Sequence, residues 1–338
     1  MVPVRFSLSA ACVLTLAAGF ASSAHAQADF YKGKTVNIIV GFTPGGGYDI
    51  NGRAIARHIS KHIPGNPTII VQNQPGAGSL SAVRNLNATL PRDGTAIVTF
   101  NPGLVTQSIV QPETVKVDFR NLAWVGVVAA DYRICYGYGP KGVKTWDDMM
   151  SRKEFILGGT GKSSGNYING SILRHVFNAP VRQILGFPGS AEQRIAIERG
   201  ELDGDCGSFS SIPPAWLVEK KINPFVRFSE KRSEEIPESA VYIGTFAKTD
   251  EQRALLGVLT GGDDIGRPFI MSKDVPADRL AIIRQAFAAT VKDPAFLSDM
   301  EKLGHPVQPL AGEAAEAIVA KMSTASPEVL KKARVIYE

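Results

Sequence analysis

Cysteine and long hydrophobic runs are scarce in this chain. Its 338 residues contain three cysteines, Cys12, Cys135 and Cys206. Beyond residue 20, no run of consecutive apolar residues approaches the ~18 that a membrane-spanning helix needs, so we do not expect a membrane-embedded protein. Lysine and arginine are scattered along the chain rather than gathered in blocks, and the formal charge is only +5. We therefore expect no nucleic-acid partner.

The first 26 residues have the order of a secretory signal peptide. Arg5 provides a positive start, residues 8–20 are mainly apolar or small, and Ala24-His25-Ala26 fits a signal-peptidase site. We predict that residues 1–26 are removed and that the mature chain is exported. About 310 residues then remain, which is enough for two domains.

Removal of that segment leaves Cys135 and Cys206. Each lies in a strand-like run, so neighbouring strands of one sheet could bring the two together. In an exported protein an isolated pair of cysteines is more often a disulfide than two free thiols, and we expect the bond, with free thiols as the alternative.

A glycine-rich turn follows the first predicted strand. Residues 36–40 form an apolar run, Pro44-Gly45-Gly46-Gly47 interrupts it, and a helical pattern begins at Asp49. Glycines let the backbone approach a ligand closely, and the first N–H groups of a helix have no intrahelical partner. The turn therefore predicts an anion site, for which a carboxylate is suited. Asp49 has two interpretations, a ligand contact or a helix-capping acid.

The same order of strand, turn and helix recurs along the chain. Similar turns follow predicted strands at residues 68–72, 96–100, 155–157 and 184–185. In such α/β units the ligand crevice lies beyond the carboxyl ends of the strands. Residues 124–130 and 265–271 are typical of strands that cross between two units. We predict two similar α/β lobes, with mostly parallel sheets flanked by helices, that face each other across a cleft.

The sequence contains no clear catalytic motif. No nucleophile elbow of the form Gly-x-Ser-x-Gly lies beside the carboxylates of Asp203 and Asp205. Residues 158–163 end in Gly-Lys-Ser, but Ile156 stands where a nucleotide P-loop needs its first glycine. His58 and His62 are one helical turn apart without the glutamate of a metalloprotease motif, so we predict surface histidines and no metal site. We expect no catalytic residue and no cofactor, with an exported hydrolase or transferase as the alternative.

At its turns the chain resembles the periplasmic solute receptors of tripartite tricarboxylate transporters, the Bug receptors. Residues 42–49 read Phe-Thr-Pro-Gly-Gly-Gly-Tyr-Asp, which is similar to the family pattern Phe-x-Pro-Gly-Gly-x-x-Asp. Residues 73–78 read Asn-Gln-Pro-Gly-Ala-Gly, close to Asn-Arg-Pro-Gly-Ala-Gly, and residues 91–95 read Pro-Arg-Asp-Gly-Thr. Weaker similarities occur at residues 186–190, 200–203 and 276–280.

The resemblance implies a type II periplasmic binding protein, a two-lobed flytrap that closes on a small organic carboxylate and delivers it to membrane permease subunits. It is not an enzyme family. Residues 27–129 plus 267–338 would form the first lobe and residues 130–266 the second. The expected ligand-binding residues lie in the turns of both lobes: Thr43, Pro44, Gly45, Gly46, Gly47, Tyr48, Asp49, Asn73, Gly76, Ala77, Asn101, Thr160, Ser163, Ser164, Asn166, Phe187, Gly189, Ser190, Asp205 and Ser208.

The second lobe departs from the family pattern. Phe187-Pro188-Gly189-Ser190 stands where family members usually carry Tyr-Lys-Gly-Ser, and Gly207-Ser208 replaces a polar Asp-Asn pair. Because Phe187 would offer apolar surface to the cleft, we expect a carboxylate with a bulkier or more apolar body than citrate. A solute sensor that reports to a signalling system stays open as an alternative to transport.

Overall fold

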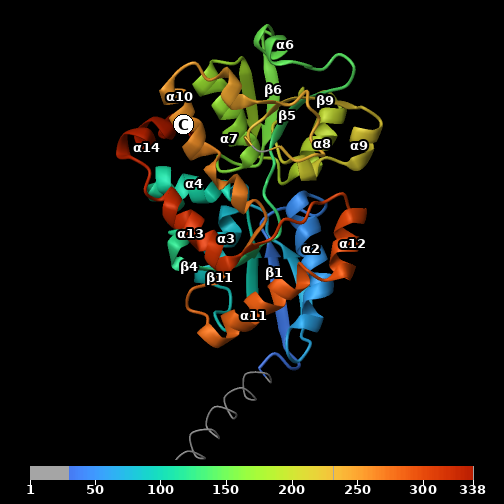
Figure 1. Ribbon diagram of the computed structural model, residues 1–338, viewed down its shortest axis with the longest axis vertical. Helices are drawn as coiled ribbons and strands as arrows, with labels where there is room; N and C mark the ends of the chain where they lie inside the picture. Colours follow the sequence, from blue (N-terminus) through green and yellow to red (C-terminus); the bar gives the residue numbers. More distant parts are fainter. Residues whose placement is uncertain (1–29, 231, 338) are drawn as a thin grey trace, which may run out of the picture.

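The computed structural model describes residues 30–230 and 232–337, so the predicted signal peptide lies outside the described residues. Two lobes, each built on a six-stranded sheet with helices packed around it, lie end to end (Figure 1). Among the residues described, no helix combines the length and the apolar character needed to cross a membrane.

The first lobe holds the sheet β12-β4-β11-β3-β1-β2. Val36, Ile38 and Val40 of β1 are buried beneath α2, whose alanines and isoleucines recur at helical spacing on the packed side. The strands are β1 (Thr35–Val40), β2 (Thr68–Asn73), β3 (Ala96–Thr99), β4 (Leu122–Val127), β11 (Pro268–Ser272) and β12 (Leu310–Ala311). The helices are α2 (Gly47–Ile59), α3 (Leu80–Ala88), α4 (Gly103–Val110), α5 (Pro112–Val115), α11 (Ala277–Thr290), α12 (Pro294–Lys302) and α13 (Gly312–Met322).

The second lobe repeats this arrangement around the sheet β10-β9-β5-β8-β6-β7. Its strands are β5 (Ile134–Tyr138), β6 (Phe155–Gly159), β7 (Val181–Leu185), β8 (Gly204–Asp205), β9 (Ile222–Arg227) and β10 (Val241–Tyr242). Its helices are α6 (Trp146–Met150), α7 (Gly165–Ser171), α8 (Ser190–Glu198), α9 (Pro214–Val218) and α10 (Asp250–Leu259), and α7 continues into a π-helical segment, Ile172–Val176.

Both sheets are mixed, which corrects the expectation of mostly parallel sheets. β1 pairs in parallel with β2 and β3, and β6 with β7 and β8. The first strand after each crossing runs against its neighbours. β5, the first strand of the second lobe, is antiparallel to β8 and β9. β11, with which the chain returns to the first lobe, is antiparallel to β3 and β4. The α/β units account for the parallel pairs, and the strands next to the crossings for the antiparallel ones.

Two segments, residues 128–133 and 263–268, cross between the lobes and pair with each other. The N–H of Val128 donates to Arg267 O, the N–H of Arg267 to Ala129 O, and the N–H of Asp131 to Asp263 O, at 3.0, 3.0 and 2.7 Å. We call these the two crossing segments. They place four charged side chains beside the interlobe space.

The chain crosses once more near its end. α14 (Pro327–Ala333) packs against α10, next to which it lies in Figure 1, and the following turn Arg334–Tyr337 buries Ile336 and Tyr337 in the core of the second lobe. Residues Arg334–Tyr337 thus form a helical turn that is anchored in the second lobe. The lobe boundaries remain a prediction, and this packing favours assigning the residues beyond about 326 to the second lobe.

A disulfide joins Cys135 and Cys206, as expected from the sequence. Cys135 lies on β5 and Cys206 directly follows β8, and the two strands are antiparallel neighbours. Both cysteines are buried in the core of the second lobe. The residue before Cys206 in the chain is Asp205, which lines the interlobe cavity described below.

Replacement of both cysteines by alanine should lower the free energy of unfolding. The bond spans 71 residues of sequence, for which loop-closure entropy predicts a loss of about 4 kcal/mol. Urea denaturation of the oxidised protein and of the double variant measures the difference. Equal midpoints for the two proteins would contradict this expectation.

Candidate functional site

A small cavity of about 50 Å³ lies between the lobes. Since roughly 10–15 Å³ of such volume holds one water molecule, the cavity has room for a few small groups. Residues from both lobes and from the first crossing segment line it: Phe42, Gly46, Gly47, Tyr48, Asn101, Asp131, Arg133, Thr160, Ser164, Gly165, Asn166, Ser190, Asp205, Ser208 and Ser211.

Three helices begin at this cavity. α2 starts at Gly47, α7 at Gly165 and α8 at Ser190, and all three residues are part of the lining. The first N–H groups of a helix lack intrahelical acceptors and carry a partial positive charge, which favours an anion. Neither Gly46 nor Gly189, the residues that precede α2 and α8, supplies a capping side chain. The hydroxyl of Thr160 is buried, lines the cavity and has no hydrogen-bond partner among the described residues.

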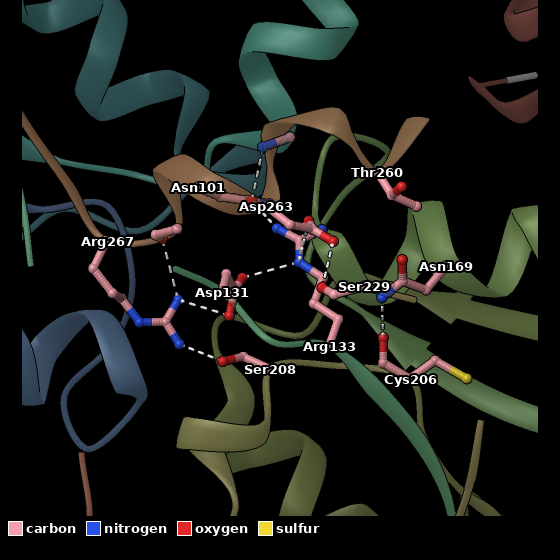
Figure 2. Close-up of polar contacts among 12 residues, drawn as sticks. Asn101, Asp131, Arg133, Asn169, Cys206, Ser208, Ser229, Thr260, Asp263 and Arg267 are labelled. Carbon is pink, nitrogen blue, oxygen red and sulfur yellow. Dashed lines mark hydrogen bonds and ion pairs between the residues drawn. The ribbon is translucent and has the colours of Figure 1, made fainter. Parts of the chain in front are cut away.

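Four buried charged residues of the crossing segments form one network, which we call the ionic lattice: Asp131, Arg133, Asp263 and Arg267 (Figure 2). Arg133 Nε lies 2.9 Å from Asp131 and 3.4 Å from Asp263, and Arg267 Nη1 lies 3.3 Å from Asp131. All four residues are buried, with at most 8% of the residue surface exposed. The lattice thus ties the two crossing segments together by charge as well as by backbone.

The lattice extends into both lobes through neutral partners. Arg133 donates to Asn101 Oδ1 at 3.1 Å in the first lobe, and Arg267 donates to Ser208 Oγ in the second (Figure 2). Arg267 also donates to Ser210 Oγ at 2.6 Å. Arg267 also lies over the ring of Tyr48, 4.5 Å from its centroid, a favourable cation–π geometry.

The two aspartates of the lattice differ in pKa. Burial acts to raise the pKa of Asp131, but the charges of Arg267 and Arg133 outweigh it and hold the pKa below its usual value. Burial raises the pKa of Asp263 to about 7, and the charges of Asp131 and Asp264 add to this while Arg133 opposes it. Asp131 has two arginine partners and Asp263 has one at a longer distance, which explains the difference.

Asp205 is a separate buried carboxylate at the cavity wall. Its Oδ1 accepts from Asn166 Nδ2 and from the N–H of Cys206, at 2.5 and 2.8 Å. Burial raises its pKa to about 6 despite these hydrogen bonds and the charge of Arg194. Arg194 itself donates to the carbonyl oxygens of Ser211 and Gly45, at 3.0 and 3.1 Å. Asp205 therefore lacks an ion-pair partner within the described part of the chain.

Hydrogen bonds across the cleft hold the lobes against each other. Thr43 Oγ1 donates to Glu192 at 3.0 Å, Asn101 Nδ2 to Ser163 O at 2.8 Å, and Ser163 Oγ to Ala77 O at 3.2 Å. The structure thus shows the lobes in contact around the cavity.

Half of the residues expected in the site line the cavity: Gly46, Gly47, Tyr48, Asn101, Thr160, Ser164, Asn166, Ser190, Asp205 and Ser208. The others lie outside its lining: Thr43, Pro44, Gly45, Asp49, Asn73, Gly76, Ala77, Ser163, Phe187 and Gly189. Their role as ligand contacts stays a prediction. Asp49, for example, has partners within the first lobe: its carboxylate accepts hydrogen bonds from the Gly45 N–H, Arg53 and Asn73 at 2.8–3.0 Å.

Phe187 lies away from the cavity. It packs beside the second-lobe core cluster that contains Ala196 and Leu202, and a Cβ on Gly158 would come within 3.3 Å of its ring. The structure therefore gives no support to a bulky apolar ligand body, and the small cavity argues for a compact one.

Sequence reasoning missed two of the charged residues in the cavity lining, Asp131 and Arg133. The available signal was a pair of charged residues between the apolar stretch 122–130 and β5, together with Arg267 in the return strand. Phe42, Gly165 and Ser211 were missed as well. A Cβ on Gly165 would lie 2.4 Å from Arg133 Nη1, so glycine is what lets α7 begin against the guanidinium.

Residues 161–165, Gly-Lys-Ser-Ser-Gly, fit the Gly-x-Ser-x-Gly spacing between β6 and α7, a match that the sequence reasoning did not consider. The hydroxyl of Ser163 is buried and donates to the Ala77 carbonyl oxygen. His58 Nε2 and His62 Nε2 lie 3.1 and 3.0 Å from the carboxylates of Asp299 on α12 and of Asp293 at its N-cap. No group of three potential metal ligands occurs within residues 30–230 and 232–337.

The fold is shared with periplasmic solute-binding proteins, so the resemblance to the Bug receptors is confirmed at the level of the fold. The periplasmic binding protein BugD aligns with a TM-score of 0.75 at 19% identity, over 90% of this chain and 99% of that one. MatC from Rhodopseudomonas palustris with bound malate aligns at 0.70 and 17%, over 90% and 99%. Another R. palustris protein, with adipate, aligns at 0.71 and 17%, over 89% and 97%.

One curated relative matches by sequence. It is the UPF0065 protein in the gbd 5′ region of Cupriavidus necator, which is 40% identical over 78 residues. The match spans 23% of this chain and 23% of that protein. No family model matches the chain.

Replacement of Asp205 by asparagine should stabilise the ligand-free protein at neutral pH. A folded-state pKa of about 6, above the unfolded value of roughly 3.9, means that the native state loses stability as the pH rises through this interval. The aspartate-to-asparagine variant does not titrate, so we expect it to be more stable than the wild type by about 3 kcal/mol at pH 7.5 and by less than about 1 kcal/mol at pH 4. Urea denaturation at both pH values tests this. A variant that is less stable at pH 7.5 would contradict it.

Proposed function

We propose that this chain is an exported solute receptor of the tripartite tricarboxylate transporter type, which closes its lobes on a small organic carboxylate. The observation that carries the proposal is the convergence of three helix N-termini on one interlobe cavity, at Gly47, Gly165 and Ser190. Backbone N–H groups at these positions suit a carboxylate without requiring a metal or a nucleotide. The malate and adipate found with two proteins of the same fold support the same ligand class.

The cavity favours binding over catalysis. A hydrolytic site needs a nucleophile within hydrogen-bond reach of a base. The serine of the elbow-like turn, Ser163, donates to a backbone carbonyl oxygen instead. His305 is engaged at 3.1 Å by Asn51, and burial together with the charge of Arg267 lowers its pKa to about 4. An enzyme acting on a carboxylate remains the alternative.

The proposal extends to location and partners. The leader-like residues 1–26 would be cleaved on export to the periplasm, where the disulfide is compatible with an oxidising compartment. Permease subunits of a tripartite transporter are the proposed recipients of the solute. A sensor role would use the same cavity, and loss of uptake of the solute in a strain lacking this chain, restored by the wild-type chain, would separate transport from sensing.

A thermal-shift screen of the mature, oxidised protein tests the ligand class. The panel contains monocarboxylic, dicarboxylic and tricarboxylic acids, amino acids, sugars and nucleotides. Binding to the native state alone stabilises it by about 2.7 kcal/mol at a hundredfold excess over the dissociation constant. We expect a shift with one group of small carboxylic acids. A shift with sugars or nucleotides only, in protein refolded free of bound solute, would contradict the proposal.

Replacement of Gly165 by alanine should weaken binding of whichever acid the screen identifies. The added Cβ would meet Arg133 Nη1 at 2.4 Å, and the ionic lattice leaves that guanidinium little freedom to move. We expect at least a tenfold loss in affinity by calorimetry, about 1.4 kcal/mol or more. Gly257→Ala on α10 is the matched control, because a Cβ there meets nothing within 4 Å. Equal affinities for the two variants would argue against a role of the α7 N-terminus.

A further inference from the structure

We propose that Ser163 of the second lobe is the knob of a closure lock, which enters a socket of the first lobe and sets how tightly the closed receptor holds its solute. The inference rests on the proposed receptor function and adds positioning residues to it, whatever the solute is. The socket is formed by Ala77, Gly78, Asn101 and Gly103, which lie in the two segments that follow β2 and β3.

Ser163 lies in the turn between β6 and α7, and two of its polar groups bond to the first lobe. Its hydroxyl donates to the Ala77 carbonyl oxygen at 3.2 Å, and its own carbonyl oxygen accepts from Asn101 Nδ2 at 2.8 Å. The residue is only 3% exposed and lies outside the cavity lining. Because both partners belong to the first lobe, separation of the lobes would break both hydrogen bonds.

Glycines on both lobes let the knob and the socket approach each other closely. A Cβ on Gly103 would overlap the carbonyl oxygen of Ser163, and a Cβ on Gly78 would lie 2.5 Å from the Ser163 hydroxyl oxygen. On the knob side, a Cβ on Gly161 would lie 2.9 Å from the backbone nitrogen of Gly78 and 3.0 Å from the carbonyl carbon of Ala77. A methyl group at any of these three positions would therefore hold the lobes apart.

Asn101 connects the lock to the cavity. Its Nδ2 donates to the knob, whereas its Oδ1 accepts from Arg133 and from the N–H of Gly103, at 3.1 and 3.0 Å. Both Asn101 and Arg133 line the cavity, so seating of the knob orients the amide that receives the guanidinium. An interaction that exists only in the closed state raises the population of that state, and the apparent affinity for the solute rises with it.

Gly103→Ala tests the lock on the mature, oxidised protein. Its methyl group would meet the backbone of the opposite lobe, which cannot rotate away, whereas alanine is the better helix former at this first residue of α4. We expect calorimetry to show at least about tenfold weaker binding of the acid that the thermal-shift screen identifies. Small-angle X-ray scattering should show compaction of the wild type at saturating acid and no compaction of the variant.

Gly161→Ala places the same obstacle on the other side of the lock. The backbone of Gly161 does not have a positive φ, so the turn itself accommodates alanine, and we expect the same loss of affinity and of compaction. Because either methyl group alone keeps the lobes apart, the double variant should bind within about twofold of the weaker single variant, whereas independent local damage would multiply the two losses. Gly257→Ala is the matched control, since a Cβ there meets nothing within 4 Å, and circular dichroism verifies that every variant is folded.

Each other outcome overturns the inference in a distinguishable way. If both single variants bind as tightly as Gly257→Ala, the lock has no part in holding the solute and the proposed receptor function stands. If they bind weakly but compact like the wild type, or if their losses multiply, the methyl groups damage the cavity and do not act on closure. If the wild type binds an acid without compaction, the closure lock is wrong. If no acid binds wild-type protein that has been refolded free of solute, the proposed function and the inference both fail.

Discussion

The ionic lattice at the crossing segments is the interaction on which the site depends. Asp131 and Arg133 come from one crossing segment, and Asp263 and Arg267 from the other. The two arginines and the two aspartates pair with one another away from water, and removal of one partner from a buried ion pair typically costs about 3–5 kcal/mol. The lattice fixes the guanidinium of Arg133 at the cavity, and through Arg267 it also fixes the ring of Tyr48.

The glycines and the helix starts are arranged around this fixed group. α7 approaches the guanidinium at Gly165, and α2 approaches Arg267 at Gly47, where a Cβ would lie 3.1 Å from Nη2. The backbone can therefore present its first N–H groups to the space between the lobes. Asp205 also lines the cavity, and burial raises the pKa of its carboxylate to about 6. Perturbed pKa values of this kind are common at binding sites.

Much of the fold could be predicted from the sequence because it rests on local patterns. The predicted strand at residues 68–72 matches β2 closely. The segments that follow β1, β3 and β6 place seven of the expected site residues in the cavity lining: Gly46, Gly47, Tyr48, Asn101, Thr160, Ser164 and Asn166. The lattice was not predictable in this way, because Asp131 and Arg133 are more than a hundred positions away from Asp263 and Arg267 in the sequence, and the two pairs meet only when both crossing segments form. Phe187 could not be placed by its turn alone, because the sequence did not reveal that its partly buried ring packs against the core cluster of the second lobe; its role as a ligand contact stays a prediction.

The most direct test of this account is a crystal structure of the mature protein with its tightest-binding small acid. We predict the ligand carboxylate within hydrogen-bond distance of the N–H groups at the starts of α2 and α7, beside Arg133, with the lattice pairs unchanged. A ligand that lies outside the interlobe cavity, or one whose carboxylate faces Asp205 rather than these N–H groups, would contradict the account.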